Sequence, residues 1–521
     1  MNVLFIMADQ LRADHLGCAG HPHLKTPNLD ALAARGVRFA NAFVNSGVCG
    51  PSRMSYYTGR YPISHGATWN RVPLSVGEVT LGEMLGDMPG GRGHRLALAG
   101  KTHVMPDLQG LKRLQLEGGS ELATLLRQGG FQEIDRYDGH HAPGAESGYP
   151  AYLRAHGYGG DDPWSEHVIS AVNGEGEVVS GWHMRHCHLP ARVKEEHSET
   201  AYMTDQAIAF IDHMGAQPWV LHLSYVKPHW PYMAPAPYHA LYTADQCLPV
   251  QRHAAERENP HPVLGAYFEQ EECQSFQRDD CIRTVRPAYQ GLITQLDHHL
   301  GRLFEHLANR GRLDDTLIVF TADHGDYLGD HWLGEKELFH DTVQQVPFIV
   351  VDPRAAADAT RGTVEQRFVE AVDVVPTVLD TLGLPLPSHR LEGRSLLPLL
   401  RGEPADGWRD FAYSELDYAY RQARLTLGKA VDRCRAFSLR TPRWRYVYWL
   451  DEPEQLYDLQ ADPQQFFDLG RETATAAVRA ELRTQLLAFL AERRHRTTVT
   501  HAQVEAATAG HKRAGVFYGQ W

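Results

Sequence analysis

The chain has 521 residues, a formal net charge of −13 and a hydrophobic content of 43%. It is too long for one compact core, so we expect one large domain and one smaller domain. The acidic balance argues against nucleic-acid binding, because contact with a phosphate backbone needs a basic face. No apolar run approaches the roughly 20 residues that cross a bilayer, which argues against a membrane partner.

The start of the chain and its cysteines favour a cytoplasmic location. The apolar run at residues 3–7 is short, lacks a basic leader and leads directly to Asp9, which is typical of a strand rather than a signal peptide. The seven cysteines are odd in number and widely scattered, unlike the disulfide framework of a small secreted domain. We therefore expect reduced thiols.

Apolar strands alternate with helices through residues 1–402, the expected large domain. Strands are predicted at residues 2–8, 37–43, 96–100, 219–225, 316–321 and 347–351. Helices are predicted from Pro27 to a stop at Gly36, near residues 81–85, at 198–214 and from Pro287 to Ala308. This alternation indicates an α/β fold with a large, mostly parallel sheet flanked by helices. Residues from about 106 to 195 have weak periodicity, so we expect an insertion or lid there.

The C-terminal part of the chain has shorter elements. Alternating segments at 436–439 and 444–449 predict an antiparallel sheet, and a helix is expected from about 473 to 494. We therefore expect a small α+β domain at residues 403–495. The tail, residues 496–521, has no core-forming pattern but ends in aromatic residues, which favours a contact between subunits of a homo-oligomer.

Polar residues follow two of the strongest predicted strands. Asp9 and Gln10 come after the first strand, and Asp323 and His324 follow the strand at 316–321. A single aspartate in such a place is more often a turn or helix cap. Carboxylate and amide oxygens also suit Ca²⁺, Mg²⁺ or Mn²⁺, whereas an imidazole nitrogen favours transition metals. Open α/β sheets place their chemistry at the carboxyl ends of strands, so these residues are candidate metal ligands.

Cys49 lies where a loop is predicted to turn into a helix, just before Pro51-Ser52-Arg53. Its sulfur is expected near the positive end of that helix dipole, with Arg53 four residues on. Such surroundings suit an anion and favour a thiolate. An isolated cysteine, however, is more often a small buried residue.

The segment Cys49-Gly50-Pro51-Ser52-Arg53, followed by Thr58-Gly59-Arg60, resembles the signature of the sulfatases, members of the alkaline phosphatase superfamily. In these enzymes the cysteine is oxidised after synthesis to formylglycine. The resemblance therefore implies formylglycine at position 49 and a formylglycine-generating maturase as a partner. It also implies one divalent ion, Ca²⁺ or Mn²⁺, whose ligands are Asp9, Gln10, residue 49, Asp323 and His324.

The resemblance extends to residues expected around the metal. Family positions that grip the sulfuryl oxygens, handle protons or bind substrate are matched by Arg53, Lys101, His103, His229, Lys336 and Asn70. Fixed cations lower the barrier because charge spreads over the non-bridging oxygens in the transition state. The resemblance implies that a hydroxyl of the hydrated aldehyde attacks sulfur while His229 or Lys336 assists departure of the alcohol. His103 then helps to remove the second hydroxyl's proton, so that the aldehyde reforms and sulfate leaves.

The expected substrate is a small-molecule sulfate ester of the arylsulfatase type, with hydrolysis of phosphonate monoesters or phosphodiesters as the alternative. Residues 227–240 and 289–294 are similar to phosphonate monoester hydrolases, whereas Gly100-Lys101-Thr102-His103 is sulfatase-like. A monoanionic sulfate ester and a monoanionic phosphodiester look alike to such a pocket, so one site could serve both.

Two other interpretations stay open. The chain could be a non-catalytic anion-binding protein whose Cys49 is never oxidised, although the intact Pro51-Ser52-Arg53 motif argues against this. A zinc site is also conceivable in a separate cluster, but its spacing fits no closed four-ligand pattern; the cluster consists of His183, His186, Cys187 and His188.

Overall fold

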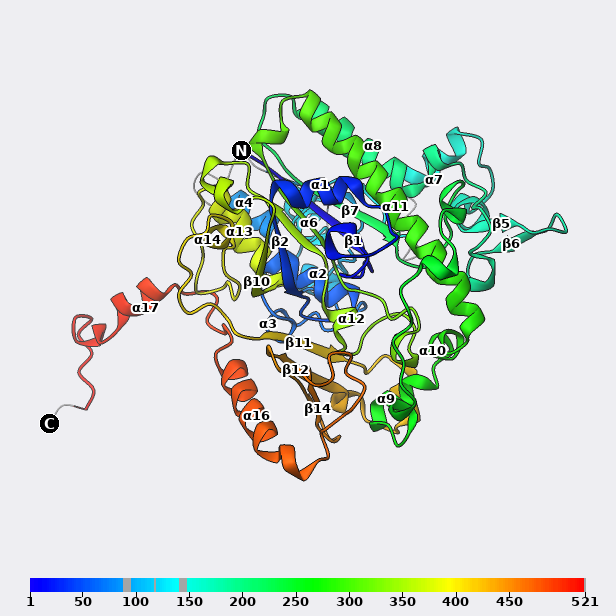
Figure 1. Ribbon diagram of the computed structural model, residues 1–521. Helices are drawn as coiled ribbons and strands as arrows, with labels where there is room; N and C mark the ends of the chain where they lie inside the picture. The colour runs from blue at the N-terminus through cyan, green and yellow to red at the C-terminus, as the bar shows by residue number, and fades with distance from the viewer. Residues whose placement is uncertain (88–94, 117–118, 140–147, 520–521) are drawn as a thin grey trace.

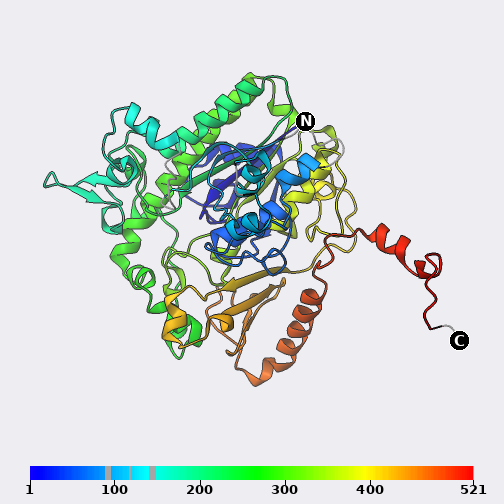
Figure 2. The ribbon, with the colours of Figure 1, turned by 180° about the vertical axis from the view of Figure 1, so that it is seen from behind.

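Two sheets organise the structure, a computed structural model that describes all residues except 88–94, 117–118, 140–147 and 520–521. The larger sheet has eight strands in the order β10-β2-β9-β8-β1-β7-β3-β4, and helices cover both of its faces (Figure 1 and Figure 2). The smaller sheet has four strands, β11-β12-β13-β14, and lies below the larger one in Figure 1. The predicted class, a large, mostly parallel α/β sheet with a smaller C-terminal α+β unit, is confirmed.

The central strands of the large sheet are buried along their whole length. The strands of this sheet are β1 (Asn2–Asp9), β2 (Val37–Phe43), β3 (Leu96–Gly100), β4 (Gln132–Arg136), β7 (Val220–Pro228), β8 (Thr316–Ala322), β9 (Phe348–Val351) and β10 (Thr363–Glu370). β1 pairs in parallel with β7 on one side and β8 on the other, and every residue of these three is buried. β9 runs antiparallel to β8 and β2. The carboxyl ends of β1, β7 and β8 therefore meet at one edge.

The sequence pattern does not predict the two outer strands, β4 and β10. Thr363 and Val364 at the start of β10 are exposed, and in β4 only Asp135 is buried. Outer strands bury little apolar surface, so their hydrophobic signal is weak. β4 lies within the segment that we expected to be an insertion or lid, and this part of the segment belongs to the main sheet.

Helices fill the connections. In the large domain they are α1 (Pro27–Arg35), α2 (Cys49–Thr58), α3 (Pro62–His65), α4 (Leu81–Asp87), α5 (Leu108–Arg113), α6 (Glu121–Arg127), α7 (Gly148–Ala155), α8 (Glu199–Met214), α9 (Pro262–Phe268), α10 (Glu271–Phe276), α11 (Asp279–Asn309), α12 (Asp341–Gln344), α13 (Val374–Thr381) and α14 (Leu397–Leu400). The expected start of α11 at Pro287 is wrong, because Ile282 and Val285 pack in the core and extend the helix ahead of the proline. A two-stranded hairpin, β5 (Ser170–Val172) and β6 (Val178–Ser180), projects from the body in Figure 1.

The small sheet packs directly against the large domain. Its strands are β11 (Ala412–Asp417), β12 (Arg435–Arg440), β13 (Trp444–Trp449) and β14 (Gln455–Asp458). The same part of the chain contains the helices α15 (Gln422–Thr426) and α16 (Ala476–Ala491). The Glu415 N–H donates to the Asn45 carbonyl at 2.9 Å, which joins β11 to the loop before Cys49. The two sheets therefore form one packed body at this point.

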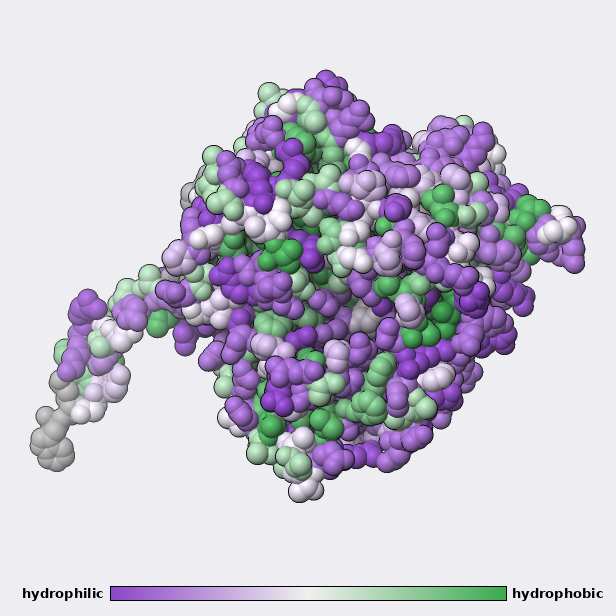
Figure 3. Space-filling model, in the orientation of Figure 1, coloured by the Kyte–Doolittle hydropathy of each residue, from purple (hydrophilic) through white to green (hydrophobic). Residues whose placement is uncertain are grey.

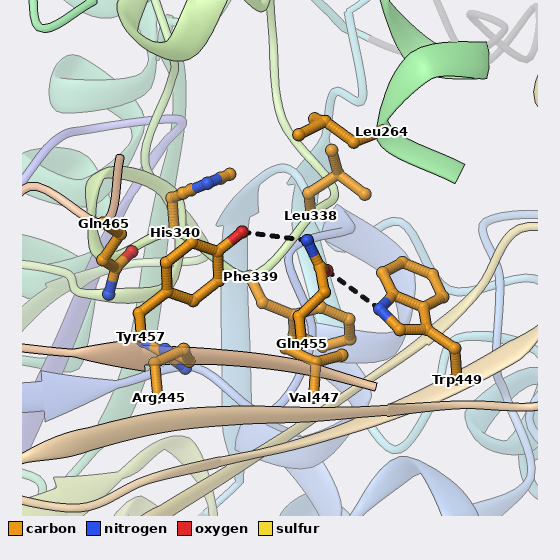
Figure 4. Close-up of a pocket in the computed structure, with 10 residues that line it drawn as sticks. All are labelled: Leu264, Leu338, Phe339, His340, Arg445, Val447, Trp449, Gln455, Tyr457 and Gln465. Carbon is orange, nitrogen blue, oxygen red and sulfur yellow. Dashed lines mark hydrogen bonds between the residues drawn. The ribbon is translucent and has the colours of Figure 1, made fainter. Parts of the chain in front are cut away.

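The small sheet also packs against residues 338–340 of the large domain, and this contact region is drawn in Figure 4. The Gln455 amide lies in it, accepting from Trp449 Nε1 at 2.9 Å and donating to the Tyr457 hydroxyl at 2.8 Å. The space left is only about 10 Å³, so this is a packing seam and not a substrate pocket. It holds the chain just after Lys336.

The surface seen in Figure 3 is mainly hydrophilic, with small separated hydrophobic areas. None of the described helices is both long enough and apolar enough to cross a bilayer. The C-terminal tail with α17 (His501–Ala507) extends away from the body in Figure 1, and its Phe517 and Tyr518 side chains are exposed.

Candidate active site

The predicted site residues meet where the carboxyl ends of the central strands face the start of α2. The side chains at or just after these ends are Asp9 (β1), Lys101 (β3), His229 (β7), and Asp323 and His324 (β8). Cys49 is the first residue of α2, as the loop-to-helix prediction required. All of these side chains are buried.

Arg53, one turn into α2, ties three strand ends together. Its Nε donates to Asp323 Oδ2 at 2.8 Å, and its Nη2 donates to Asp9 Oδ2 at 3.2 Å. Its Nη1 donates to the Lys101 carbonyl at 2.9 Å and to Ser224 Oγ at 2.8 Å. Ser224, in the middle of β7, had not been predicted to take part. A fully buried guanidinium with every donor group paired is a rigid element.

Asp9 is surrounded by cations. Lys101 Nζ lies 2.5 Å from its Oδ2, and His229 Nε2 lies 4.0 Å from its Oδ1. Burial raises the pKa of the Asp9 carboxyl, but Lys101, His229, Arg53 and Lys336 outweigh burial and hold that pKa well below its usual value. Asp9 is therefore ionised across the physiological pH range.

The Cys49 thiol lies between an imidazole and an ammonium group. Its Sγ is 3.1 Å from His324 Nε2 and 3.0 Å from Lys336 Nζ, and it lies 3.9 Å from Asp9 Oδ1. Burial and Asp9 raise the pKa of the thiol, whereas Lys336, His324 and Lys101 lower it by more, so the pKa falls below its ordinary value. Position 49 is thus suited to an anionic or strongly polarised group.

Backbone carbonyls select the tautomers of the two histidines. His324 Nδ1 lies 2.8 Å from the Gly325 carbonyl, and His229 Nδ1 lies 2.6 Å from the Trp230 carbonyl. A carbonyl only accepts, so each Nδ1 carries the proton and each Nε2 faces the site. His324 Nε2 faces position 49, whereas His229 Nε2 lies 3.0 Å from Lys336 Nζ and accepts from it.

Gln10 connects the site to two residues that the sequence reasoning missed. Its Nε2 donates to Asp326 Oδ2 at 2.6 Å and lies 3.4 Å from the Tyr232 hydroxyl, while its Oε1 accepts from Lys336 Nζ at 3.3 Å. Tyr232 also donates to Asp326 at 2.7 Å. The Gln10 N–H donates to Asp323 Oδ1 at 3.0 Å. The run of polar residues after β8 continues to Asp326, and this was the available signal.

His103 and Asn70, both predicted site residues, lie in supporting loops. The backbone N–H groups of Thr102 and His103 donate to Asp138 Oδ1 at 2.8 and 3.1 Å, which fixes the turn after Lys101. Asn70 Oδ1 accepts from the Gly50 N–H at 2.7 Å, so Asn70 orders the first turn of α2. Sequence reasoning missed Asp138 because it lies 35 residues beyond His103.

The donor set fits one divalent ion. Ligand atoms of Asp9, Cys49, Asp323 and His324 all lie within 4.8 Å of one another. Opposite ligands on an ion with bonds of about 2.0–2.4 Å lie no more than about 4.8 Å apart, so the spacing suits a single ion. Two carboxylates and one imidazole are compatible with Mn²⁺ and, less well, with Ca²⁺. Gln10 lies at the same edge, with its amide oxygen on the Lys336 side.

The segment that carries Lys336 has an unusual backbone. Left-handed φ angles occur at Leu328, Gly329, His331, Trp332, Glu335 and Glu337. Side chains with a Cβ avoid this region, at about 1 kcal/mol or more each, so surrounding contacts have to impose the conformation. Such clusters of strained residues are frequent at functional sites.

Long-range contacts impose this conformation. Arg286 Nε donates to the Leu328 carbonyl at 2.9 Å, and His331 Nδ1 lies 2.6 Å from Glu256 Oε1. Glu337 Oε2 accepts from the Tyr267 hydroxyl at 2.6 Å and lies 3.0 Å from Arg421 Nε. These partners come from α11, α9, the short helix Ala254–Arg257 and the small domain. They position Lys336 Nζ next to Cys49. In the sequence, only the short motif Gly334-Glu335-Lys336 indicated that this lysine belongs to the site.

The structure does not support the possible zinc cluster. Cys187 is buried, and its thiol donates to the Thr284 carbonyl at 3.4 Å, while His188 Nδ1 lies 2.8 Å from the Arg185 carbonyl. Within the described residues, the donor clusters that form are the active-site group and the buried trio Glu256, His331 and His340.

Known protein families and individual proteins are similar to this chain over most of its length. The profile of the family described as Sulfatase matches residues 1–384, and that described as N-sulphoglucosamine sulphohydrolase, C-terminal, matches residues 329–492. The multifunctional alkaline phosphatase superfamily protein PehA of Trinickia caryophylli is 34% identical, over 96% of this chain and 97% of the relative. The arylsulfatase of Clostridium perfringens is 27% identical, over 90% of each chain.

Solved structures agree with these matches. The crystal structure of the phosphonate monoester hydrolase of Agrobacterium radiobacter superposes with a TM-score of 0.82 and 30% identity. The superposition covers 94% of this chain and 95% of that one. The similarity therefore spans both sheets.

Proposed function

Because the chain belongs to the sulfatase family, we propose that it is a sulfuric ester hydrolase of the arylsulfatase type, built on position 49 and one divalent metal. The observation that carries the proposal is the position of the Cys49 side chain, 3.0 Å from Lys336 Nζ and 3.1 Å from His324 Nε2. An anionic ester at this point lies beside the Lys336 ammonium group and near Lys101 and Arg53, fixed cations that match its charge.

The nucleophile that we propose is formylglycine, made from Cys49 by a maturase. Its hydrated aldehyde supplies two hydroxyls, one to attack the ester and one to release the product. The Cys49 Sγ marks where these oxygens would lie. Support comes from the motif Cys49-x-Pro51-Ser52-Arg53 at the start of α2 and from the buried, cationic surroundings of position 49.

The metal ligands that we propose are Asp9, Gln10, Asp323 and His324, together with residue 49. A divalent ion there supplies Lewis-acid polarisation of the nucleophile and of the ester oxygens. The spacing of the donors and the Nε2 lone pair of His324 support this assignment.

Arg53 and Lys101 act as fixed charge around the reacting group. Arg53 is held by four hydrogen bonds, so it needs no reorganisation when charge develops on the ester oxygens. His103 acts on the proton of the second hydroxyl, and Asn70 lies beside the substrate at the start of α2. His103 is held in place by its neighbour Asp138.

Lys336 delivers the proton, or the hydrogen bond, that the departing alcohol needs. Burial lowers the pKa of its ammonium group, but Cys49, Asp9 and Glu335 raise it by more, so Lys336 is charged at neutral pH. His229 Nε2 accepts from Lys336 at 3.0 Å, so once Lys336 has given its proton to the alcohol, a proton that His229 Nε2 takes up from solvent passes to Lys336 along the same contact. Two groups on the leaving side thus form a short relay.

Hydrolysis of phosphonate monoesters and phosphodiesters is the second candidate. The 30% identity with a solved phosphonate monoester hydrolase, over almost the whole chain, favours it. The same cations and metal ligands suit either monoanionic ester, so we propose a promiscuous enzyme in which the sulfate ester is preferred.

Two measurements test the proposal. Peptide mass spectrometry across residues 40–60 and metal analysis of the same sample should find formylglycine at position 49 and one divalent ion per chain. Comparison of kcat/KM for an aryl sulfate and an aryl phosphonate should favour the sulfate. An active preparation with only an unmodified thiol would overturn the nucleophile, and a preference for phosphonate would reverse the order of the two candidates.

We also propose a cytoplasmic homo-oligomer. All seven cysteines are free, as in a reducing compartment, and the exposed Phe517 and Tyr518 offer a contact for a second subunit. Light scattering of the full chain and of a chain ending at residue 495 tests this proposal. Equal monomer masses would overturn the subunit contact.

A further inference from the structure

A cavity of about 270 Å³ lies beside the leaving-group side of the active site. Its walls come from four parts of the chain: the loop after β6, the segment after β7, α10 and the Lys336 segment. Among the residues that line it are Trp182, Trp230, Tyr232, Glu271, Phe276 and Glu335.

The cavity is connected to the reacting groups by direct neighbours. The Trp230 ring stacks on the His229 ring, with centroids 4.8 Å apart and planes 29° apart. Glu335 directly precedes Lys336, and the Tyr232 hydroxyl lies 3.4 Å from Gln10 Nε2. His229 and Lys336 are the groups that serve the leaving oxygen. The rest of the alcohol therefore extends towards this cavity.

Aromatic rings form much of the wall. Trp182 and Trp230 meet edge to face with centroids 5.1 Å apart, and the buried ring of Phe276 packs against Tyr232 at 6.4 Å. Trp182 is 44% exposed, which is unusual for so large an apolar side chain. Rings arranged in this way offer π-faces to a ligand.

The charge in the cavity has one sign. Three glutamates line it, and none of the described residues lining it is a lysine, arginine or histidine. Glu272 is paired with Arg421, and Glu271 and Glu272 stand in the first turn of α10, where the helix dipole favours acidic residues. Glu335 has no such explanation. In the described part of the chain, no hydrogen bond or ion pair engages its carboxylate, which lies at the cavity wall.

We propose that this cavity binds the alcohol part of the substrate, and that the alcohol carries a cationic alkylammonium group. Tryptophan faces attract an alkylated ammonium, and the Glu335 carboxylate, which makes no direct ion pair among the described residues, contributes to its neutralisation. The volume suits a small amino alcohol, because larger ligands need cavities of about 300–1,000 Å³. The sulfate or phosphonate end would meanwhile lie at position 49. This inference rests on the proposed ester hydrolysis.

Two isosteric esters test it directly. 2-(Trimethylammonio)ethyl sulfate and 3,3-dimethylbutyl sulfate have the same shape and differ by one positive charge, and the matching phenylphosphonate monoesters extend the test to the second ester class. We expect kcat/KM to favour the cationic member at least about tenfold in both classes, mainly through KM.

Matched variants separate the cavity from the overall charge of −13, which attracts any cation. Glu335→Gln should remove most of the preference for the cationic ester, measured as the ratio of the two kcat/KM values, because any effect of Glu335 on the charge of Lys336 acts on both esters and cancels in that ratio. Trp182→Ala should reduce the preference several-fold. Glu269→Gln removes an exposed charge just before α10, outside the cavity, and should leave both values unchanged.

Each outcome is decisive. Equal kcat/KM for the two members of a pair, or a preference that Glu269→Gln reduces as much as Glu335→Gln does, would overturn the cationic subsite while leaving the proposed hydrolysis intact. Absence of hydrolysis for all four esters, and for aryl sulfates and phosphonates as well, would overturn the proposed function and this inference with it.

Discussion

The active site has two halves that are held in place in different ways. The strand-end half consists of residues at strand ends and the start of α2: Asp9, Cys49, Arg53, Lys101, Asp323 and His324. The loop half is the segment 326–337, which carries Lys336. Strand pairing positions the first half, whereas contacts with α9, α11 and the small domain position the second.

The difference suggests a division of labour. In the mechanism that we propose, the strand-end half binds and polarises the charged end of the ester, so it has to be rigid. The loop half faces the leaving group and the cavity beside it, where substrates of one family differ most. A segment held by long-range contacts can change its side chains without disturbing the sheet.

Loss of the nucleophile gives the largest effect and breaks the strand-end half. Cys49→Ala should lower kcat for every ester by roughly 10⁴-fold, because the covalent route is lost. Cys281→Ala, which removes a half-buried thiol on α11, is the control and should keep full activity. Turnover by Cys49→Ala at the original rate would contradict the mechanism.

Loss of Lys336 tests the loop half. Lys336→Ala should lower kcat by roughly 10²–10³-fold for an alkyl ester, which needs protonation of its leaving oxygen, and by much less for a 4-nitrophenyl ester. The exposed Lys194→Ala is the control. An equal loss for both esters would mean that Lys336 binds the charged end instead.

Metal removal tests the strand-end half alone. A chelator should abolish most of the activity, and re-addition of Mn²⁺ or Ca²⁺ should restore it. The fold should survive with a shift of only a few °C in Tm, because Arg53 forms ion pairs with Asp9 and Asp323 and Lys101 forms one with Asp9, and these pairs do not depend on the ion. Thermal unfolding with and without chelator measures this. Global unfolding on chelation would contradict the expectation.

Substitution of Glu337, which holds the loop half in place, should lower kcat by a smaller factor and mainly for alkyl esters. Glu337→Gln weakens contacts with Tyr267 and Arg421, so Lys336 becomes less well positioned. We expect a fall in kcat of about tenfold, greater for alkyl than for 4-nitrophenyl esters, with unchanged metal content. Glu452→Gln, which loosens a partly buried ion pair with Lys429 elsewhere in the small domain, is the control. Loss of metal in Glu337→Gln would show that the halves are not independent.

The smallest effect concerns pH and stability. Burial raises the pKa of Glu335 from 4.5 to about 7, so the folded state holds a proton that the unfolded state has lost. Ionisation of Glu335 therefore destabilises the fold as pH rises from about 4.5 to 7, and the full cost is present above about 7. Between pH 5 and pH 8 the free energy of unfolding of Glu335→Gln, measured with urea, should rise by about 2–3 kcal/mol relative to that of the wild type. Parallel stability profiles would contradict this.

Much of the strand-end half could be predicted because its signals are local. Continuous apolar runs mark β1 and β8, and the polar residues that follow them are adjacent in sequence. Ser224, Asp138 and Asp326 were missed because their hydrogen-bond partners, two side chains and the backbone N–H groups of residues 102–103, lie elsewhere in the chain. The same holds for β10, whose exposed start hides it, and for Pro287, which core packing accommodates inside α11.

The sequence by itself determined the α/β class, the central strands and the residues at their ends, because hydrophobic periodicity and short motifs are properties of neighbouring residues. Only the tertiary structure decided that Lys336 reaches position 49, that its segment adopts left-handed backbone angles, and that Trp182, Trp230 and Glu335 share one cavity. These features depend on contacts between residues from 42 to 287 positions apart, and no local pattern records such contacts.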